Sequence, residues 1–358
     1  MAVVVSPTRG QISAAIPPFA RLRPLVIAGL LLLAAALLGI VSGKAPLDAG
    51  EVVRMIAHRA GLAAPVSWPL SHEAILFDIR MPRVALAALT GAALGMAGAT
   101  YQGLFRNPLA DPYLLGIASG ASLGVVIAFV LPLPALIPRL GAVQALAFAG
   151  AIIAVTAVYG LARTGATAPT GTLLLAGIAL GSLANAIATY LMYRHGEQLL
   201  VIYGWLLGGF NTATWQEVRL AALALAASGV VMTIGGRTLN LLQFGEEQAA
   251  TLGVRVERSK LILVAAASLA TAAAVAAGGL IGFVGLVVPH VTRLLFGPDQ
   301  RQLLPLAALL GAAFLITADT AARSLPGTSE LPVGVVTAVI GAPFFLYLLR
   351  RQKRVPTW

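Results

Sequence analysis

RTLNLLQFGEEQAATLGVRVERSK, residues 237–260, is the stretch that governs the interpretation of the whole chain. It carries seven charged side chains, whereas only 10% of the 358 residues are charged, and apolar segments flank it on both sides. Its apolar positions are Leu239, Leu242, Ala249, Leu252 and Val254, interrupted by Gly245 and Gly253. This pattern predicts two short amphipathic helices in a water-exposed loop between membrane helices. An apolar face left in water is typical of a docking surface for another protein, and a simple connecting loop has no need of one.

The composition indicates a polytopic membrane protein. Hydrophobic residues make up 59% of the chain and the mean hydropathy is +0.90, whereas a soluble domain is about half apolar and a quarter charged. The absence of cysteine excludes disulfides and thiolate metal sites. Residues 1–24 are predicted to form an N-terminal tail, and the apolar run that follows is too long for a cleaved signal peptide, so we expect it to stay as the first membrane helix.

Ten segments are long and apolar enough to cross a bilayer, which takes about 20 residues in a helix. They lie near residues 25–42, 84–105, 113–132, 140–162, 171–193, 218–236, 261–278, 280–296, 303–322 and 331–349. The seventh and eighth share one uncharged run, residues 261–292, and we divide it at Gly278-Gly279 because it is too long for one crossing. Without this division the chain would have nine spans.

The distribution of charge favours ten spans over nine. With the N-terminus in the cytoplasm, the inner segments hold 15 Lys and Arg and five acids, and the outer segments hold nine and eight. This asymmetry is what the positive-inside rule requires. Nine spans would move the basic residues of 350–354 to the wrong side, so we expect both termini, including a tail at 351–358, to be cytoplasmic.

The longest polar segment on the outer side is residues 42–83, which is long enough for a short surface helix. It ends in Arg80-Met-Pro-Arg83, directly before the second span. Basic residues at a helix start usually anchor it at the membrane interface. Because the positive-inside rule disfavours arginine on the outer side, a specific acidic partner is the alternative explanation.

No catalytic constellation is present, so we expect neither a catalytic nor a metal site, and any ATP would be hydrolysed by another chain. The histidines are scattered, and the HExxH and GxSxG patterns are absent. Asp319 is the only acid within the predicted spans and lies four residues before Arg323, where a local ion pair accounts for it. Transport coupled to protons or sodium usually needs acids near the bilayer midplane, so this class is disfavoured.

Seven stretches between residues 80 and 350 resemble one known family in sequence and in order. They are RMPR (80–83), GAALGMAGATYQGLFRNPLADPYLLGIASGA (91–121), LLLAGIALG (173–181), GEEQAATLGV (245–254), GLIGFVGLVVPH (279–290, with Arg293 after it), ADTAAR (318–323) and ELPVGVVTAVIGAPFFLYLL (330–349). The chain resembles the FecCD family, the permease subunits of type II ABC importers for iron chelates, haem and vitamin B12.

The resemblance implies an all-α permease fold, with the membrane domain at residues 25–350, in the bacterial inner membrane. It implies a homodimer, two cytoplasmic ATPase subunits that hold ATP-Mg, and a periplasmic substrate-binding protein. We expect no cofactor bound by this chain and no nucleic-acid partner. An iron complex, haem or a ferric siderophore, is the favoured substrate because such permeases are the larger share of the family, and cobalamin is the alternative.

The resemblance also implies roles for individual residues. Residues 238–257 correspond to two coupling helices that contact the ATPase, and the residues we assign to this contact are Leu242, Gly245, Glu246, Glu247, Leu252 and Gly253. Arg80, Arg83 and Arg323 match positions that receive acidic residues of the binding protein. Asn107, Thr170 and Gly171 match the cytoplasmic gate, although the B12 branch has a hydroxyl residue at the last position. A membrane assembly subunit that moves no substrate is the rival from another functional class.

Overall fold

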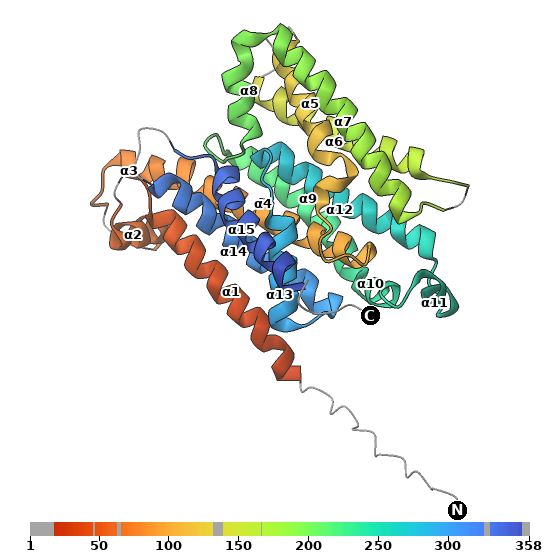
Figure 1. The fold of residues 1–358 in the computed structure, drawn as a ribbon. Helices are drawn as coiled ribbons and strands as arrows, with labels where there is room; N and C mark the ends of the chain where they lie inside the picture. Colours follow the sequence, from red (N-terminus) through yellow and green to blue (C-terminus); the bar gives the residue numbers. More distant parts are fainter. Residues whose placement is uncertain are drawn as a thin grey trace, which may run out of the picture.

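The computed structural model describes residues 18–45, 47–62, 66–131, 139–165, 167–325 and 330–352, and these residues fold into a helical bundle (Figure 1). The helices of the bundle are α1 (Pro18–Val41), α4 (Met81–Leu104), α5 (Ile117–Val130), α6 (Arg139–Ala162), α7 (Thr170–Arg194), α9 (Trp215–Ile234), α12 (Val256–Gly278), α13 (Val284–Phe296), α14 (Gln300–Ser324) and α15 (Val333–Gln352). Within these described residues, seven helices are long and apolar enough to span a membrane, and α5, α13 and α15 contribute shorter apolar stretches. The all-α, multi-pass fold is thus confirmed.

Short helices lie at the two ends of this bundle. They are α2 (Ala49–Arg59), α3 (Leu70–Ala74), α8 (Leu199–Leu206), α10 (Gly236–Leu242) and α11 (Glu246–Thr251). Figure 1 shows α2 and α3 at one extreme of the molecule and α10 and α11 at the other. Of the two predicted tails, residues 1–17 and 353–358 lie outside the described residues, and α1 begins at Pro18, before the predicted start of the first span.

The predicted division at Gly278-Gly279 is confirmed, because α12 ends at Gly278 and α13 begins at Val284. Gly279 has φ +74° and Phe283 has φ +67°, so the backbone turns twice through the left-handed region between the two helices. Gly279 also lies so close to Trp205 and Gly208 that a side chain there would overlap their backbone. Glycine therefore serves both the turn and the close approach.

The boundary of the second span was predicted wrongly. Residues 70–104 form one continuous helical segment, so the stretch before Arg83 is helix and not loop. A π turn at Ile75–Arg80 joins α3 to α4, and Met81 N–H donates to the carbonyl of Leu76, five residues earlier. Pro82 explains the wider turn, because proline cannot donate to the carbonyl four residues before it and its ring crowds that carbonyl.

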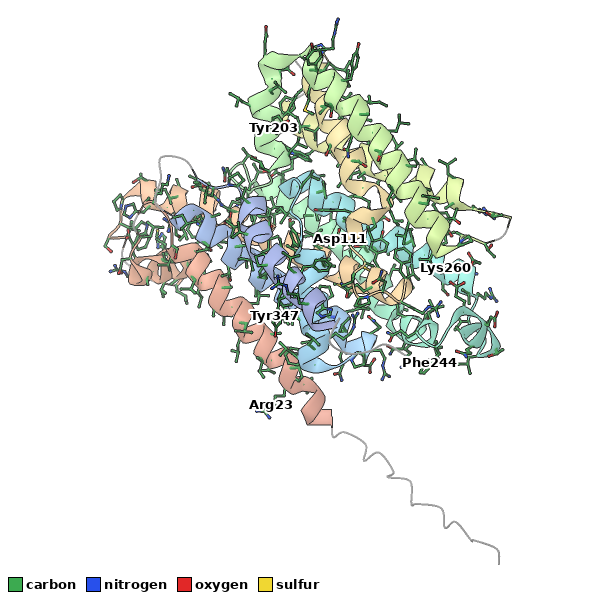
Figure 2. The ribbon with its side chains drawn as sticks, viewed as in Figure 1. Arg23, Asp111, Tyr203, Phe244, Lys260 and Tyr347 are labelled. Carbon is green, nitrogen blue, oxygen red and sulfur yellow. The ribbon has the colours of Figure 1, made fainter. Side chains whose placement is uncertain are left out.

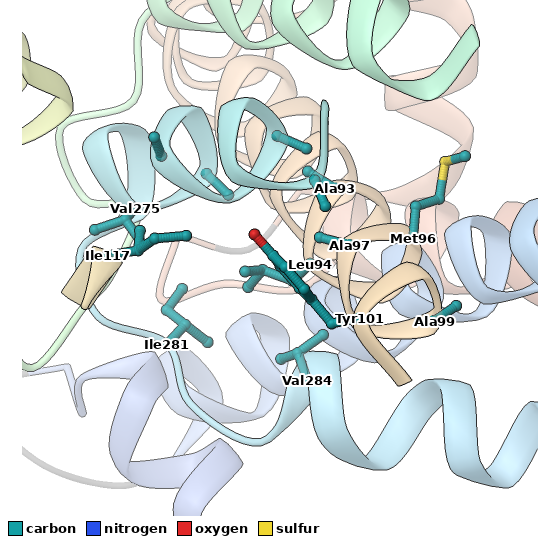
Figure 3. Close-up of a cluster of buried hydrophobic side chains, with 14 of the residues drawn as sticks. Ala93, Leu94, Met96, Ala97, Ala99, Tyr101, Ile117, Val275, Ile281 and Val284 are labelled. Atoms are coloured by element: carbon teal, nitrogen blue, oxygen red, sulfur yellow. The ribbon is translucent and has the colours of Figure 1, made fainter. Parts of the chain in front are cut away.

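Helix α4 is the centre of the bundle, and small residues let its neighbours approach it closely. A side chain at Gly91 would overlap the carbonyl of Gly311 on α14, and one at Gly98 would overlap that of Gly285 on α13. Small residues at such crossings are how helices in lipid pack without a hydrophobic driving force. Toward the C-terminal end of α4 lies the fully buried Tyr101, which is labelled in Figure 3. Its hydroxyl is 2.7 Å from that of Ser268 on α12.

Candidate functional site

The loop between α9 and α12 contains two short helices, as predicted. Helix α10 ends at Leu242 and α11 begins at Glu246, and Gly245 between them has φ +119°, a conformation that other residues rarely adopt. The prediction that the apolar face of this loop lies in water is largely wrong, because Leu239, Leu242 and Ala249 are buried against the bundle. Leu242 can therefore position the loop but offers no exposed contact.

What the loop does expose is a compact surface with two large apolar side chains. Phe244 is 71% exposed and Leu252 is 63% exposed, and Figure 2 shows Phe244 at the edge of the molecule. We call the exposed residues Phe244, Glu247, Gln248, Thr251 and Leu252 the α10–α11 surface. Gly253 is exposed beside it and has φ +86°, whereas Gly245 and Glu246 are half-buried. Sequence periodicity places these residues on a loop but does not say which of them face outward.

A polar contact fixes α10 to the start of α14. The Asn240 amide donates to Asp299 Oδ1 over 2.7 Å, and its own oxygen accepts the N–H of Gln300 over 2.9 Å. Asp299 also accepts the N–H of Arg301 as the N-cap of α14 and pairs with its guanidinium over 2.7 Å. These hydrogen bonds, the one from Arg301 foremost, lower the pKa of Asp299 below its usual range. The loop is therefore held to the bundle by packing at Leu239 and by this polar contact.

A second polar contact joins α11 to the start of α7, and sequence analysis missed it. The Lys260 ammonium is 3.1 Å from Glu246, 3.3 Å from Glu257 and 3.1 Å from the carbonyl oxygen of Ala168, just before Thr170. Lys260 is only 3% exposed although it was expected to end a solvated loop. The spacing of Glu257 and Lys260 was a signal for an ion pair, but nothing in the sequence pointed to Ala168.

Both predicted gate segments border the same loop. Asn107 is exposed and its side-chain oxygen accepts the N–H of Leu109 over 2.9 Å, as expected of a turn residue before proline. The preceding residue, Arg106, has φ +50°, and its guanidinium lies beside Gly245. Thr170 is the first residue of α7 and Gly171 is exposed next to it. The described contacts do not join Asn107 to Thr170, and their role as a gate stays a prediction.

At the opposite end of the bundle, two of the predicted docking arginines hold the last turn of α1. Arg80 donates to the carbonyls of Ile40 and Val41 over 2.9 and 2.7 Å, and also to that of Ala45. Arg323 donates to the carbonyls of Gly39 and Ser42. The last carbonyls of a helix lack partners within it and carry partial negative charge, so they suit a guanidinium.

The third arginine, Arg83, makes a buried ion pair with Asp319. Its guanidinium reaches the two carboxylate oxygens over 2.8 to 3.1 Å and also lies 2.8 Å from Glu330. The predicted local ion pair of Asp319 with Arg323 is present as a single contact of 3.4 Å, but Arg83, which the sequence did not indicate as a partner, lies closer to this carboxylate. Arg83 thus has an acidic partner, which was the alternative explanation for this arginine, and the partner belongs to the same chain.

The interpretation of Arg80 and Arg83 as interface anchors is also wrong, since both are buried and hydrogen-bonded inside the chain. Their proposed contact with a binding protein is a prediction that these contacts do not test.

Sequence analysis did not identify a further buried acid, Glu217, because α9 begins earlier than predicted. Glu217 lies in its first turn, where it forms a capping box with Thr214 and accepts the Gln144 amide.

Comparison with known proteins gives a consistent result. The sequence profile of the FecCD transport family matches residues 31–351. The cobalamin import system permease protein BtuC of Halobacterium salinarum is 46% identical over 293 residues, covering 81% of this chain and 78% of its own. The hemin transport system permease protein HmuU of Yersinia pestis is 44% identical over 282 residues, covering 78% and 84%.

A solved structure shares the fold at full length. A metal-chelate type ABC transporter in an inward-facing conformation superposes with a TM-score of 0.79 and 29% identity, covering 92% of this chain and 99% of its own. With the profile match across residues 31–351, these similarities establish that the chain is an ABC transporter permease of the FecCD transport family.

Proposed function

We propose that this chain is the permease subunit of an ATP-driven importer that carries a metal chelate across the inner membrane into the cytoplasm. The observation that carries the proposal is the α10–α11 surface, which exposes Phe244 and Leu252 on a loop that is otherwise packed onto the bundle. Burying such side chains contributes about 2 kcal/mol each, which suits a partner that docks there. We assign this partner as a separate ATPase subunit, two copies of which hold and hydrolyse ATP-Mg.

The charge distribution supports an orientation with the α10–α11 surface and both termini in the cytoplasm. Arg237, Arg255 and Arg258 are exposed near this surface, as the positive-inside rule requires for the cytoplasmic side. The end with α2 and α3 then faces the periplasm. We propose that a substrate-binding protein docks at that end, where Arg80, Arg83 and Arg323 shape the surface and Glu330 is partly exposed.

The exposed polar side chains of helix α7 support the proposal that the chain forms a homodimer with a transport path between the two copies. Most of its residues are exposed in the single chain, and the exposed ones include Ser182, Asn185 and Thr189 on one side of the helix. Hydroxyl and amide groups on a membrane helix usually face another helix or water and not lipid. We therefore propose that this side of α7 faces the second copy of the chain and the path between the two copies.

The substrate class follows from the relatives and from the nature of the path. Relatives above 40% identity are named for hemin and for cobalamin, both of which are metal ions held in a large tetrapyrrole-type ring. A path lined by small polar and apolar groups would bind such a ring weakly, which suits its release. An iron complex remains our first choice, haem before a ferric siderophore, with cobalamin as the alternative.

The test is ATP hydrolysis and uptake by the complete transporter in lipid vesicles, with its partner ATPase and binding protein. The binding protein is loaded in turn with haem, a ferric siderophore or cobalamin. Stimulation and uptake with one of them would support the importer and identify the ligand. If no ATPase associates with the chain and replacement of residues 245–254 has no effect, the non-transporting assembly subunit is favoured instead.

A further inference from the structure

The ammonium group of Lys260, which is labelled in Figure 2, joins α11, the first turn of α12 and the residue Ala168 that precedes α7. Its three hydrogen-bond partners are Glu246 Oε1 in α11, Glu257 Oε1 in the first turn of α12 and the carbonyl oxygen of Ala168. An ammonium has three N–H donors, so each segment takes one of them. We call Lys260, Glu246, Glu257 and Ala168 the Lys260 clamp.

Because the Lys260 side chain is buried, its ammonium group needs these hydrogen-bond partners. Lysine is almost never fully buried unless it is paired, and here the side chain is 4% exposed, while the two carboxylates are partly exposed at 42% and 30%. If α11 moved away by itself, the buried ammonium would lose one of its three partners, which is costly for a buried charge. The clamp therefore resists separation of α11 from the rest of the cluster.

The clamp holds the backbone that leads into α7. Ala168 donates its N–H to Glu257 Oε2 over 3.2 Å and gives its carbonyl to Lys260, so both of its backbone polar groups are taken by the ion pair. Pro169 follows as the N-cap of α7 without a side-chain hydrogen bond, and the predicted gate residue Thr170 is next. Few residues of α7 are fully buried, which makes this attachment at its first turn important.

We propose that Lys260 is a positioning residue that makes α11 and the first turn of α7 move as one body. This inference rests on the proposed function, in which an ATPase moves the α10–α11 surface. A displacement of α11 would reach α7 through Glu246, Lys260 and Ala168, without any contact between the ATPase and the gate. Lys260 thus serves to convert movement of the coupling loop into movement of the gate.

The direct test measures the distance between α11 and α7. The chain has no native cysteine, so Ala250→Cys and Thr172→Cys, both at exposed positions, can carry a pair of spin labels in the complete transporter. We expect the same inter-label distance without nucleotide and with ATP trapped. In Lys260→Met the distance should change between these states. Arg258→Met is the matched control, because it removes the same charge from an exposed site on the same helix, and it should keep the distance constant.

A second readout separates positioning from folding. Uptake per ATP hydrolysed should fall in Lys260→Met by about tenfold, a loss typical of broken coupling between linked sites, and should not change in Arg258→Met. If Lys260→Met does not accumulate in the membrane, Glu246→Ala removes only the α11 contact while Glu257 still pairs with Lys260. It should show the same change in distance and the same loss of uptake per ATP.

Two results would overturn the inference. One is an inter-label distance that changes with ATP in the unmodified clamp. The other is an unchanged inter-label distance and unchanged uptake per ATP in both Lys260→Met and Glu246→Ala. Failure of the proposed function looks different, because the chain with an intact clamp would then bind no ATPase and take up no substrate.

Discussion

Replacing Asp319 with asparagine keeps the shape of the side chain and removes one negative charge from the interior. Asp319 is 1% exposed, and the Arg83 guanidinium binds it through three hydrogen bonds of 2.8 to 3.1 Å. Removing one member of a buried ion pair costs about 3–5 kcal/mol, because the other charge stays behind unpaired. Since Glu330 remains on Arg83, we expect Asp319→Asn to cost about 3 kcal/mol, at the lower end of that range.

The assay is unfolding of the purified protein in mixed micelles, followed by tryptophan fluorescence, as a double-mutant cycle. The Asp319→Asn and Arg83→Gln pair should show a coupling energy of about 2 kcal/mol. With Arg323→Gln in place of Arg83→Gln the coupling should stay below about 1 kcal/mol, because the contact of Arg323 with Asp319 is a single one of 3.4 Å. Equal coupling to both arginines, or a loss below about 0.5 kcal/mol in Asp319→Asn, would refute the reasoning.

Two further predictions concern the packing and the capping of single helices. Gly91→Ala should destabilise the bundle by about 2 kcal/mol, because the new methyl group would overlap the carbonyl of Gly311. Gly29→Ala is the control, because there is open space around Gly29, and this variant should change thermal stability little. Asp299→Ala should cost about 1 kcal/mol through loss of the α14 cap and should remove the acceptor of the Asn240 amide N–H. Because the folded-state pKa of Asp299 is lowered, the advantage of wild type should be complete above about pH 5 and should shrink as the pH falls; a pH-independent difference would contradict this.

The lengths of the apolar segments, the asymmetric distribution of charge and the positions of glycine were enough to predict most of the fold. They gave the ten apolar helices, the break after Gly278 and the two short helices of the α10–α11 loop. These features depend on local composition and on the bilayer, both of which a single sequence reports. The resemblance to the FecCD family added the identity, which the profile match then established.

Partners distant in sequence could not be predicted. Arg83 and Asp319 are separated by 236 positions, and sequence proximity suggested the weaker partner, Arg323. Helical periodicity marked Leu242 as apolar but did not say that it packs on the bundle. The continuous helix through Pro82 was missed because proline normally marks a helix start, and here a π turn accommodates it.

Docking of an ATPase subunit on the α10–α11 surface should protect a single cysteine placed there from alkylation. Gln248→Cys lies within this surface, and Arg54→Cys lies on α2 at the other end of the molecule, both exposed in a chain with no other cysteine. The rate of alkylation by a water-soluble maleimide is measured for each variant with and without the ATPase subunit. Alkylation should slow strongly at position 248 alone when the ATPase subunit is present, and equal rates there with and without the ATPase would exclude docking at this surface.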